Sequence, residues 1–275
     1  MSANAQITKL FNDYKNGSRT DALSASEGKL VTDTIAELDQ GQRRITEKIN
    51  DKYATQTWLK EAILLYFRLM KMNPIKAGDL EFYDKIPVKK WTGAESVRVV
   101  PPAIARFGSF IEAGAILMPS YVNIGARVGA GTMIDTWATV GSCAQIGKNV
   151  HISGGVGIGG VLEPIQAQPV VIEDNCFIGS RCILVEGVLV EEGAVLGAGV
   201  TITSSTKIID VSSSKEIIYQ GCVPKNSVVI PGSIQKQFPA GTYGVHCALI
   251  IGKRKASTDL KTSLTDVLRD FQVAV

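Results

Sequence analysis

The sequence predicts a mainly β protein: a left-handed parallel β-helix with an N-terminal α-helical domain and a short C-terminal extension. Three observations lead to this prediction. Large aliphatic residues recur at every sixth position, small or β-branched residues follow four positions later, and both patterns begin only after residue 97. Before that point the apolar residues recur at spacings of three and four, the period of an amphipathic helix. A chain of 275 residues, 45% of them hydrophobic, is long enough to bury a sizeable core.

We expect three regions: a helical domain over residues 1–97, the β-helix over 98–238 and an irregular extension over 239–275. Ser24 and Glu27 form a plausible capping box at the start of one helix. A second helix stops before Pro74, because proline disfavours helical geometry in the residue that precedes it. The apolar faces consist of Leu30, Val31, Ile35 and Leu38 in the first helix and of Trp58, Leu59, Ala62, Ile63, Leu65, Tyr66 and Leu69 in the second.

The six-residue unit is expected to be one short strand and one corner. The large residue points into the core, and the small residue, for example Gly108 or Gly114, sits inside the corner. Three units make a triangular coil, and successive coils stack about 4.8 Å apart, the spacing of parallel strands. Such coils wind left-handed, although the sequence alone does not show the hand. The expected core positions are Ile104, Phe110, Ile116, Val122, Val128, Ile134, Val140, Ile146, Ile152, Ile158, Ile172, Ile178, Leu184, Val190, Leu196 and Ile202.

Two loops are expected to interrupt the coils. The repeat breaks after Ile158, near residues 160–169, and resumes shifted by two at Ile172. It breaks again near residues 207–220 and returns briefly as Val223 and Val229.

The charge balance gives no general argument for a polyanionic partner. Lys and Arg number 29 against 26 Asp and Glu, a formal net charge of +3. The N-terminus has no apolar stretch of the kind a signal peptide needs, and no uncharged run is long enough to span a membrane. We therefore predict a cytoplasmic protein that binds neither nucleic acid nor membrane.

The cysteines and histidines favour packing over metal binding. Five cysteines, an odd number, fit free thiols in a reducing compartment. Cys176 and Cys182 fall on the small-residue positions of the repeat, which packing explains. One branch of hexapeptide-repeat proteins holds zinc with three histidines, whereas this chain has two, His151 and His246. We expect no metal.

The repeat does not by itself define a function. A purely structural solenoid would have little use for two loops and a helical domain. Many proteins with this repeat are acyltransferases that use acyl-coenzyme A, and some of them use a histidine as base. His151, which precedes a predicted core isoleucine, is a candidate base, and a surface histidine with no catalytic duty is the other interpretation.

Several stretches resemble tetrahydrodipicolinate N-succinyltransferases, above all MIDTWATVGSCAQIGKNVH, with FRLMKMNPIKAG and FYDKIPVK before it. The resemblance runs over nearly the whole chain. It implies transfer of the succinyl group of succinyl-coenzyme A, a cosubstrate, to the amino group of ring-opened tetrahydrodipicolinate. The products would be N-succinyl-2-amino-6-oxopimelate and coenzyme A, in lysine and diaminopimelate biosynthesis. It also implies a homotrimer with active sites between subunits and no tightly bound cofactor. A related acetyltransferase that uses acetyl-coenzyme A is the alternative.

The resemblance also implies site residues. Arg98, in VRVVPP, matches the family's substrate-binding arginine, and Asp135, in MIDTW, matches its active-site aspartate. Arg181, in FIGSR, is a second candidate for a substrate carboxylate, which a guanidinium binds bidentately. Asp135 follows the core residue Ile134 and so should face outward. Ser153, its equivalent one coil later, should lie about 4.8 Å away and hydrogen-bond the substrate.

The chain departs from the family at one place. Ile183 occupies the position where the family has a glutamate, a second acidic group near the amine, and the nearest acid, Glu186, lies half a repeat away. Coenzyme A brings phosphate groups that need cations. Lys253 and Arg254, which form a basic cluster with Lys255, are the candidates, with a solvated tail as the alternative.

Overall fold

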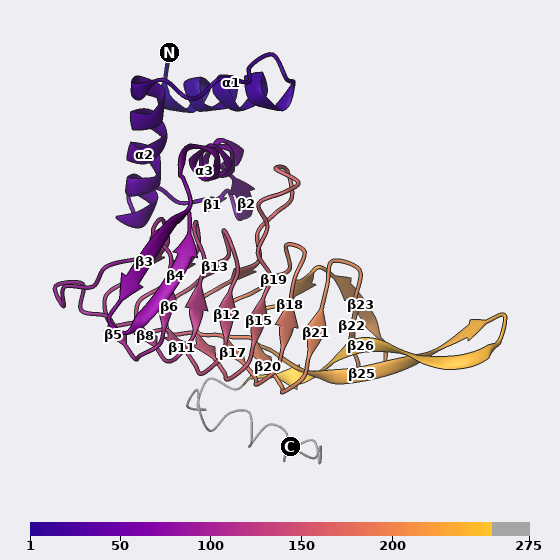
Figure 1. Cartoon of the computed structure of the whole chain (residues 1–275). Helices are drawn as coiled ribbons and strands as arrows, with labels where there is room; N and C mark the ends of the chain where they lie inside the picture. Colours follow the sequence, from indigo (N-terminus) through magenta and orange to yellow (C-terminus); the bar gives the residue numbers. More distant parts are fainter. Residues whose placement is uncertain (255–275) are drawn as a thin grey trace.

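The computed structural model describes residues 1–254, in which three helices lie beside a long parallel β-helix (Figure 1). The helices are α1 (Ala3–Lys15), α2 (Ala25–Asp39) and α3 (Thr57–Leu69). The capping box of α2 is confirmed: the Ser24 side chain accepts a hydrogen bond from the backbone N–H of Glu27, whose carboxylate accepts one from the backbone N–H of Ser24. Helix α1 was not predicted, because it buries only Ile7 and Leu10 and so shows little apolar periodicity.

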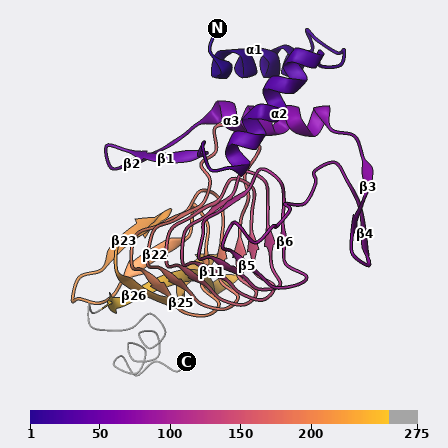
Figure 2. The same ribbon diagram turned by 90° about the vertical axis from the view of Figure 1, so that its left-hand side faces the viewer.

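The N-terminal region also contains two antiparallel hairpins that the sequence analysis missed. Strand β1 (Thr46–Ile49) pairs with β2 (Lys52–Thr55), and β3 (Asn73–Ala77) pairs with β4 (Leu80–Asp84). Figure 2 shows the hairpins on opposite sides of the molecule, below the helices. The apolar faces of the three helices share one core, which includes Ile124 and Cys143 of the β-helix. The helices are thus seated directly on the coils.

Three parallel sheets form the walls of the β-helix, and Figure 2 shows the coils stacked behind one another. We call them the first, second and third sheets. The first contains β5 (Arg98–Val99), β8 (Ile116–Leu117), β11 (Met133–Ile134), β14 (His151–Ile152), β17 (Phe177–Ile178), β20 (Val195–Leu196) and the start of β25 (Ser227–Phe238). The second contains β6 (Ile104–Ala105), β9 (Tyr121–Val122), β12 (Thr139–Val140), β15 (Gly157–Ile158), β18 (Ile183–Leu184) and β21 (Thr201–Ile202). The third contains β7 (Phe110–Ile111), β10 (Arg127–Val128), β13 (Gln145–Ile146), β16 (Val171–Ile172), β19 (Leu189–Val190) and β24 (Cys222–Val223).

The predicted core positions are confirmed from Val122 to Ile202, since each of these side chains is at most 2% exposed. The first three predictions are wrong. The buried residues there are Ala105, Ile111 and Leu117, one position after Ile104, Phe110 and Ile116. The cause is a unit of five residues between Leu117 and Val122, which shifts the frame by one.

In the first coil, the positions of the small interior residues also shift by one residue. Ser109 and Ala115 fill the interior there, at 0% and 1% exposure. Gly108 and Gly114, which we expected inside, lie instead at turns with φ of +86° and +83°, a conformation that glycine adopts without strain.

The first interruption of the repeat is held by a buried lysine of α3. The Lys60 ammonium donates hydrogen bonds to the carbonyl oxygens of Pro164, Ile165 and Ala167, at 3.2, 2.9 and 3.0 Å. Burial lowers the pKa of Lys60, and the three carbonyls compensate the buried charge. This contact joins α3 to the loop after β15.

The second interruption is a hairpin and not a loop. Strand β22 (Lys207–Asp210) pairs antiparallel with β23 (Ile217–Gln220) and joins the end of the first sheet. The prediction of an irregular extension is also wrong for residues 241–253. They form β26 (Gly241–Lys253), which runs antiparallel to β25 and parallel to β22. Figure 1 shows the β25–β26 hairpin reaching beyond the last coils. The rest of the predicted extension, residues 255–275, lies outside the described residues, and the division into domains stays a prediction.

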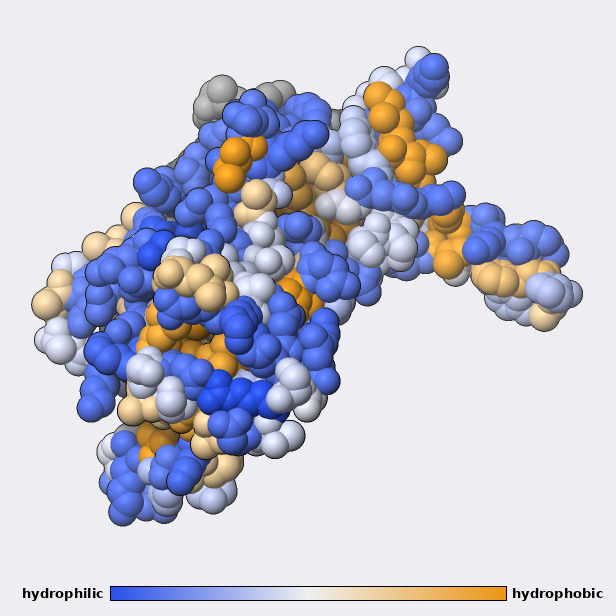
Figure 3. Space-filling model, turned by 90° about the horizontal axis from the view of Figure 1, so that it is seen from above, coloured by the Kyte–Doolittle hydropathy of each residue, from blue (hydrophilic) through white to orange (hydrophobic). Residues whose placement is uncertain are grey.

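Packing accounts for the cysteines. All five are free thiols, and Cys176 and Cys182 are fully buried at corners of the coils. Burial raises the pKa of both thiols to about 12, so they are neutral at physiological pH. None of the helices in the described range has the length and apolar character needed to cross a bilayer. Seen from the side that carries the helices, the surface is largely hydrophilic (Figure 3).

The frame of the coils makes a prediction about stability. Ile152 faces the core at 0% exposure, whereas Ile183 faces outward at 38% exposure. Ile152→Ala should lower the free energy of unfolding by about 2–5 kcal/mol, because it leaves a cavity in a closely packed core. Ile183→Ala, the matched control, should lower it by less than about 1 kcal/mol. Urea titration measures both, and equal losses would contradict the assigned frame.

Candidate active site

Asp135 and Ser153 lie one above the other at the outer edge of the first sheet. Strands β11 and β14 pair with Met133 opposite His151 and Ile134 opposite Ile152. The backbone N–H of Asp135 donates to the carbonyl oxygen of Ile152 at 2.9 Å. The stacking expected from the repeat is therefore confirmed. The functional roles of the two residues stay predictions.

One oxygen of the Asp135 carboxylate is held by the next residue. Oδ1 accepts hydrogen bonds from the backbone N–H of Thr136 at 2.6 Å and from its hydroxyl at 3.2 Å. Oδ2 has no hydrogen bond with any residue from 1 to 254. The carboxylate is thus oriented by its neighbour and keeps one oxygen to receive a proton or an ammonium group. Sequence reasoning missed Thr136, for which its place directly after Asp135 was the only signal.

The two predicted arginines lie on opposite sides of Asp135 along the helix axis. Arg98 is in β5, which pairs with β8, which in turn pairs with β11, so it lies two coils before Asp135. Arg181 follows β17, which pairs with β14, and lies two coils after Asp135. Both arginines are exposed, and within the described part of the chain neither side chain has an ion pair or a hydrogen bond. The axial order is Arg98, Asp135, Arg181.

His151 lies in the first sheet, two residues before Ser153, whereas Ile183 and Glu186 lie in other parts of the coils. The His151 ring stacks on Phe177, with centroids 5.0 Å apart and planes at 9°, so its ring packs along the first sheet. Ile183 lies in the second sheet, in register with Gly157 and Thr201.

Glu186 lies at the corner between the second and third sheets, not at the corner after Asp135. Its carboxylate accepts hydrogen bonds from the backbone N–H and hydroxyl of Ser204, at 3.2 and 2.7 Å. Within one chain, Glu186 therefore does not take the place of an acid at position 183.

Lys253 and Arg254 are at the end of β26 and contact their own chain. The Lys253 ammonium donates to the Ser227 hydroxyl at 2.9 Å. The Arg254 guanidinium donates to the carbonyl oxygens of Asn175 and Gly193, at 2.8 and 3.4 Å. These contacts place them at the corner where the chain enters the first sheet, across that sheet from Asp135. Their role as phosphate ligands stays a prediction, and Lys255 lies outside the described residues.

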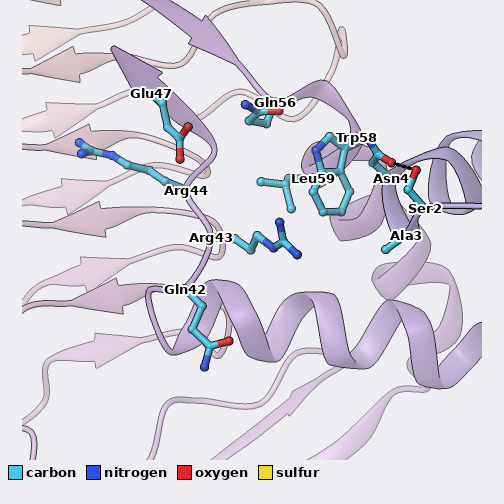
Figure 4. A pocket seen from close by; sticks show the side chains of 10 residues that line it. All are labelled: Ser2, Ala3, Asn4, Gln42, Arg43, Arg44, Glu47, Gln56, Trp58 and Leu59. Carbon is cyan, nitrogen blue, oxygen red and sulfur yellow. Dashed lines mark hydrogen bonds between the residues drawn. The ribbon is translucent and has the colours of Figure 1, made fainter. Parts of the chain in front are cut away.

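A hollow among the N-terminal elements includes none of the predicted site residues. Figure 4 shows its lining, in which the Arg43 side chain points toward the Trp58 ring beside Leu59. The guanidinium carbon of Arg43 is 5.5 Å from the centre of the Trp58 ring. Within residues 1–254 no group of three His, Cys, Asp or Glu side chains could hold a metal ion. This hollow is therefore separate from the predicted site residues Arg98, Asp135, Ser153 and Arg181, which lie along the first sheet and at its corners.

Comparisons with known proteins agree with this architecture. Residues 2–69 match the family model described as tetrahydrodipicolinate N-succinyltransferase N-terminal, and residues 169–204 match the hexapeptide repeat of succinyl-transferase. The chain is 52% identical, over 269 residues, to the 2,3,4,5-tetrahydropyridine-2,6-dicarboxylate N-succinyltransferase of Acinetobacter baylyi, covering 96% of this chain and 97% of that one. The chain belongs to the tetrahydrodipicolinate N-succinyltransferase family.

Other members of the tetrahydrodipicolinate N-succinyltransferase family are equally similar. The enzyme of the same name from Polynucleobacter asymbioticus is 54% identical over 248 residues, covering 87% of this chain and 89% of that one. A solved structure, a putative 2,3,4,5-tetrahydropyridine-2-carboxylate N-succinyltransferase from Campylobacter jejuni, matches with a TM-score of 0.53 at 18% identity. That match covers 89% of this chain and 65% of the Campylobacter chain, and it supports the left-handed β-helix fold of the family.

Proposed function

We propose that the chain transfers the succinyl group of succinyl-coenzyme A to the amino group of ring-opened tetrahydrodipicolinate, in lysine and diaminopimelate biosynthesis. The products are N-succinyl-2-amino-6-oxopimelate and coenzyme A. The relatives that share 52–54% of its residues carry the name of this activity. The structural observation that supports it most directly is the order Arg98, Asp135, Arg181 on one open side of the coils. An acid that can receive a proton lies between two unpaired cations that suit carboxylates.

Asp135 is assigned to the attacking amine. An amine is an ammonium at neutral pH, so it must lose a proton before it can attack. Oδ2 of Asp135 has no hydrogen bond in the described chain and can take that proton, while Thr136 keeps the carboxylate oriented through Oδ1. The amine nitrogen then bonds to the thioester carbonyl carbon, the C–S bond breaks, and the thiolate of coenzyme A leaves and takes up a proton.

Arg98 is assigned to a carboxylate of the acceptor. Its guanidinium is exposed and unpaired within residues 1–254, and a planar guanidinium binds a carboxylate through two parallel hydrogen bonds. The Ser153 hydroxyl, one coil beyond Asp135, is assigned to a hydrogen bond with the same acceptor. Lys253 and Arg254 are assigned to coenzyme A phosphates at the C-terminal end of the coils.

We also propose that the protein is a cytoplasmic homotrimer with active sites between neighbouring β-helices. An open face holds a substrate poorly, because water screens its charges, and a second subunit over that face would enclose the site. The free thiols suit a reducing compartment. We assign no tightly bound cofactor.

A thiol-release assay tests the proposed activity. Succinyl-coenzyme A should be consumed only in the presence of an amino-dicarboxylate such as 2-aminopimelate, because the thioester is stable until a positioned amine attacks it. Binding of coenzyme A without acceptor-dependent release would argue against an enzyme. A strong preference for acetyl-coenzyme A would support the related acetyltransferase instead.

Substitutions at Arg98 and Asp135 should separate binding from chemistry. Arg98→Ala should raise KM for the acceptor on the order of 10- to 100-fold, because a charge-assisted pair is lost. Asp135→Asn keeps the shape but removes the proton acceptor, and should lower kcat on the order of 10²–10⁴-fold. Asp51→Asn, in the turn between β1 and β2, is the matched control and should change neither constant. Turnover of Asp135→Asn within threefold of the unmodified protein would place the base elsewhere.

Restoring the family's glutamate should be tolerated. Ile183 is 38% exposed, so a carboxylate at this position stays in contact with water and carries little desolvation cost. Ile183→Glu should leave kcat/KM unchanged or raise it. Glu186→Gln should leave kcat within about threefold, because Glu186 contacts Ser204 at another corner. A clear loss in Ile183→Glu would show that the site depends on an apolar residue there.

The assembly can be measured directly. The chain has a mass of 29.4 kDa, and at micromolar concentration sedimentation equilibrium should give three times that value. A mass near that of one chain would rule out a stable trimer.

A further inference from the structure

One corner of the β-helix carries two large exposed side chains where the backbone is left-handed. It lies between the first and second sheets. The left-handed residues of its successive coils are Trp137, Gly155, Arg181 and Gly199, with φ of 59°, 69°, 62° and 75°. Backbone hydrogen bonds align these coils: the N–H of Gly155 donates to the carbonyl of Thr136 at 2.9 Å, and the N–H of Arg181 to that of Gly154 at 3.1 Å.

The corner between the third and first sheets follows the ordinary backbone preference at positive φ. Its left-handed positions are held only by glycine or asparagine, the residues that adopt positive φ at least cost. They are Gly114, Gly131, Asn149, Asn175, Gly193 and Asn226. Tryptophan and arginine are less favourable in this conformation, and the Trp137 side chain is 68% exposed, so burial does not compensate. Neither backbone preference nor core packing accounts for Trp137 and Arg181.

Gly155 forms a shelf for the Arg181 side chain. A Cβ atom at Gly155 would lie 2.7 Å from Nε, 2.8 Å from Cδ and 2.9 Å from Cζ of Arg181. The arginine side chain therefore turns back across the coil between its own and that of Trp137. Its charge has no ion pair or hydrogen bond within residues 1–254, so an anion that reaches this shelf would be its first partner.

The shelf at Gly155 lies about one coil from Asp135, the proposed proton acceptor, and this spacing matches the length of a succinyl group. Asp135 is two residues before Trp137 in the same coil, and Gly155 is one coil farther along, about 4.8 Å at the spacing of parallel strands. In succinyl-coenzyme A, three C–C bonds separate the thioester carbon from the carboxylate carbon, which is close to one coil spacing. Arg98 lies on the other side of Asp135, so the two arginines are four coils apart, about 19 Å. They suit two different molecules better than the two ends of one acceptor.

We propose that Arg181 binds the free carboxylate of a dicarboxylic acyl donor and that the Trp137 indole packs against the acyl chain. This corner would then select succinyl over uncharged acyl groups. The assignment rests on the proposed function for the identity of the donor. It replaces the expectation that Arg181 serves the acceptor, which Arg98 serves from the other side.

Glycine variants test the proposal without endangering the fold, because glycine favours positive φ. Calorimetric titration of the full chain with succinyl-coenzyme A and butyryl-coenzyme A, which has the same acyl length but no carboxylate, gives the two Kd values. The unmodified protein should bind the succinyl donor on the order of 10- to 100-fold more tightly. In Arg181→Gly this ratio should fall to about threefold or less, through weaker binding of succinyl-coenzyme A alone. Trp137→Gly should weaken both donors alike and keep the ratio.

Asn50→Gly, in the turn between β1 and β2 where the backbone is also left-handed with φ of 48°, is the matched control and should leave both Kd values unchanged. An unmodified protein that binds the two donors equally or binds neither, or an Arg181→Gly variant that keeps the original ratio, would overturn the proposal. The measurement needs no acceptor, so it is independent of turnover. A protein that discriminates between the donors but releases no thiol with 2-aminopimelate would contradict the proposed function and leave this inference standing.

Discussion

The fixed spacing of parallel strands is the constraint on which this structure depends. Backbone hydrogen bonds hold each coil to the next, so a residue and its equivalent one coil later must lie side by side at about 4.8 Å. The same rule stacks Ile134 on Ile152 in the core and Asp135 on Ser153 where the first sheet ends. Residues far apart in sequence therefore acquire fixed positions along one axis. In such a fold, the place of a side chain along the axis determines which part of a substrate it can reach.

The repeat predicts most of the β-helix, and its one failure has a physical reason. Between Val128 and Ile158 the residue that precedes the core residue is polar or glycine in every strand but one, so hydropathy shows there which of the two faces inward. In the first coil both residues of each strand are apolar, as in Ile104–Ala105, Phe110–Ile111 and Ile116–Leu117. Hydropathy cannot choose between two apolar neighbours, and the five-residue unit that decides the frame lies downstream. Strand β26 was missed for another reason. It is a long strand that pairs antiparallel with β25, so its sequence does not have the six-residue repeat of the coils.

The candidate site was predictable in parts. The outward direction of Asp135 follows from its place after Ile134, and its stacking on Ser153 follows from the repeat. The choice of Asp135 and Arg98 among many exposed charges came from the resemblance, because an outward acid or base on a coil is ordinarily a solvated group. Sequence could not show that Arg181 lies across Gly155, since this depends on the direction of a side chain at a left-handed corner. It also could not show that Glu186 contacts Ser204.

Lys60 joins helix α3 to the loop after β15, and so connects the helical region to the β-helix. If α3 moved away, three carbonyl groups would lose their donor, and an ammonium ion would leave a site shaped for it. Because the three helices share one apolar core with Ile124 and Cys143 of the coils, detaching them exposes apolar surface at the same time. Detaching the helices would therefore lose the Lys60 hydrogen bonds and expose the apolar core in the same step. We therefore expect the helical region and the middle coils to unfold together, with the loop after β15 as the contact that joins them.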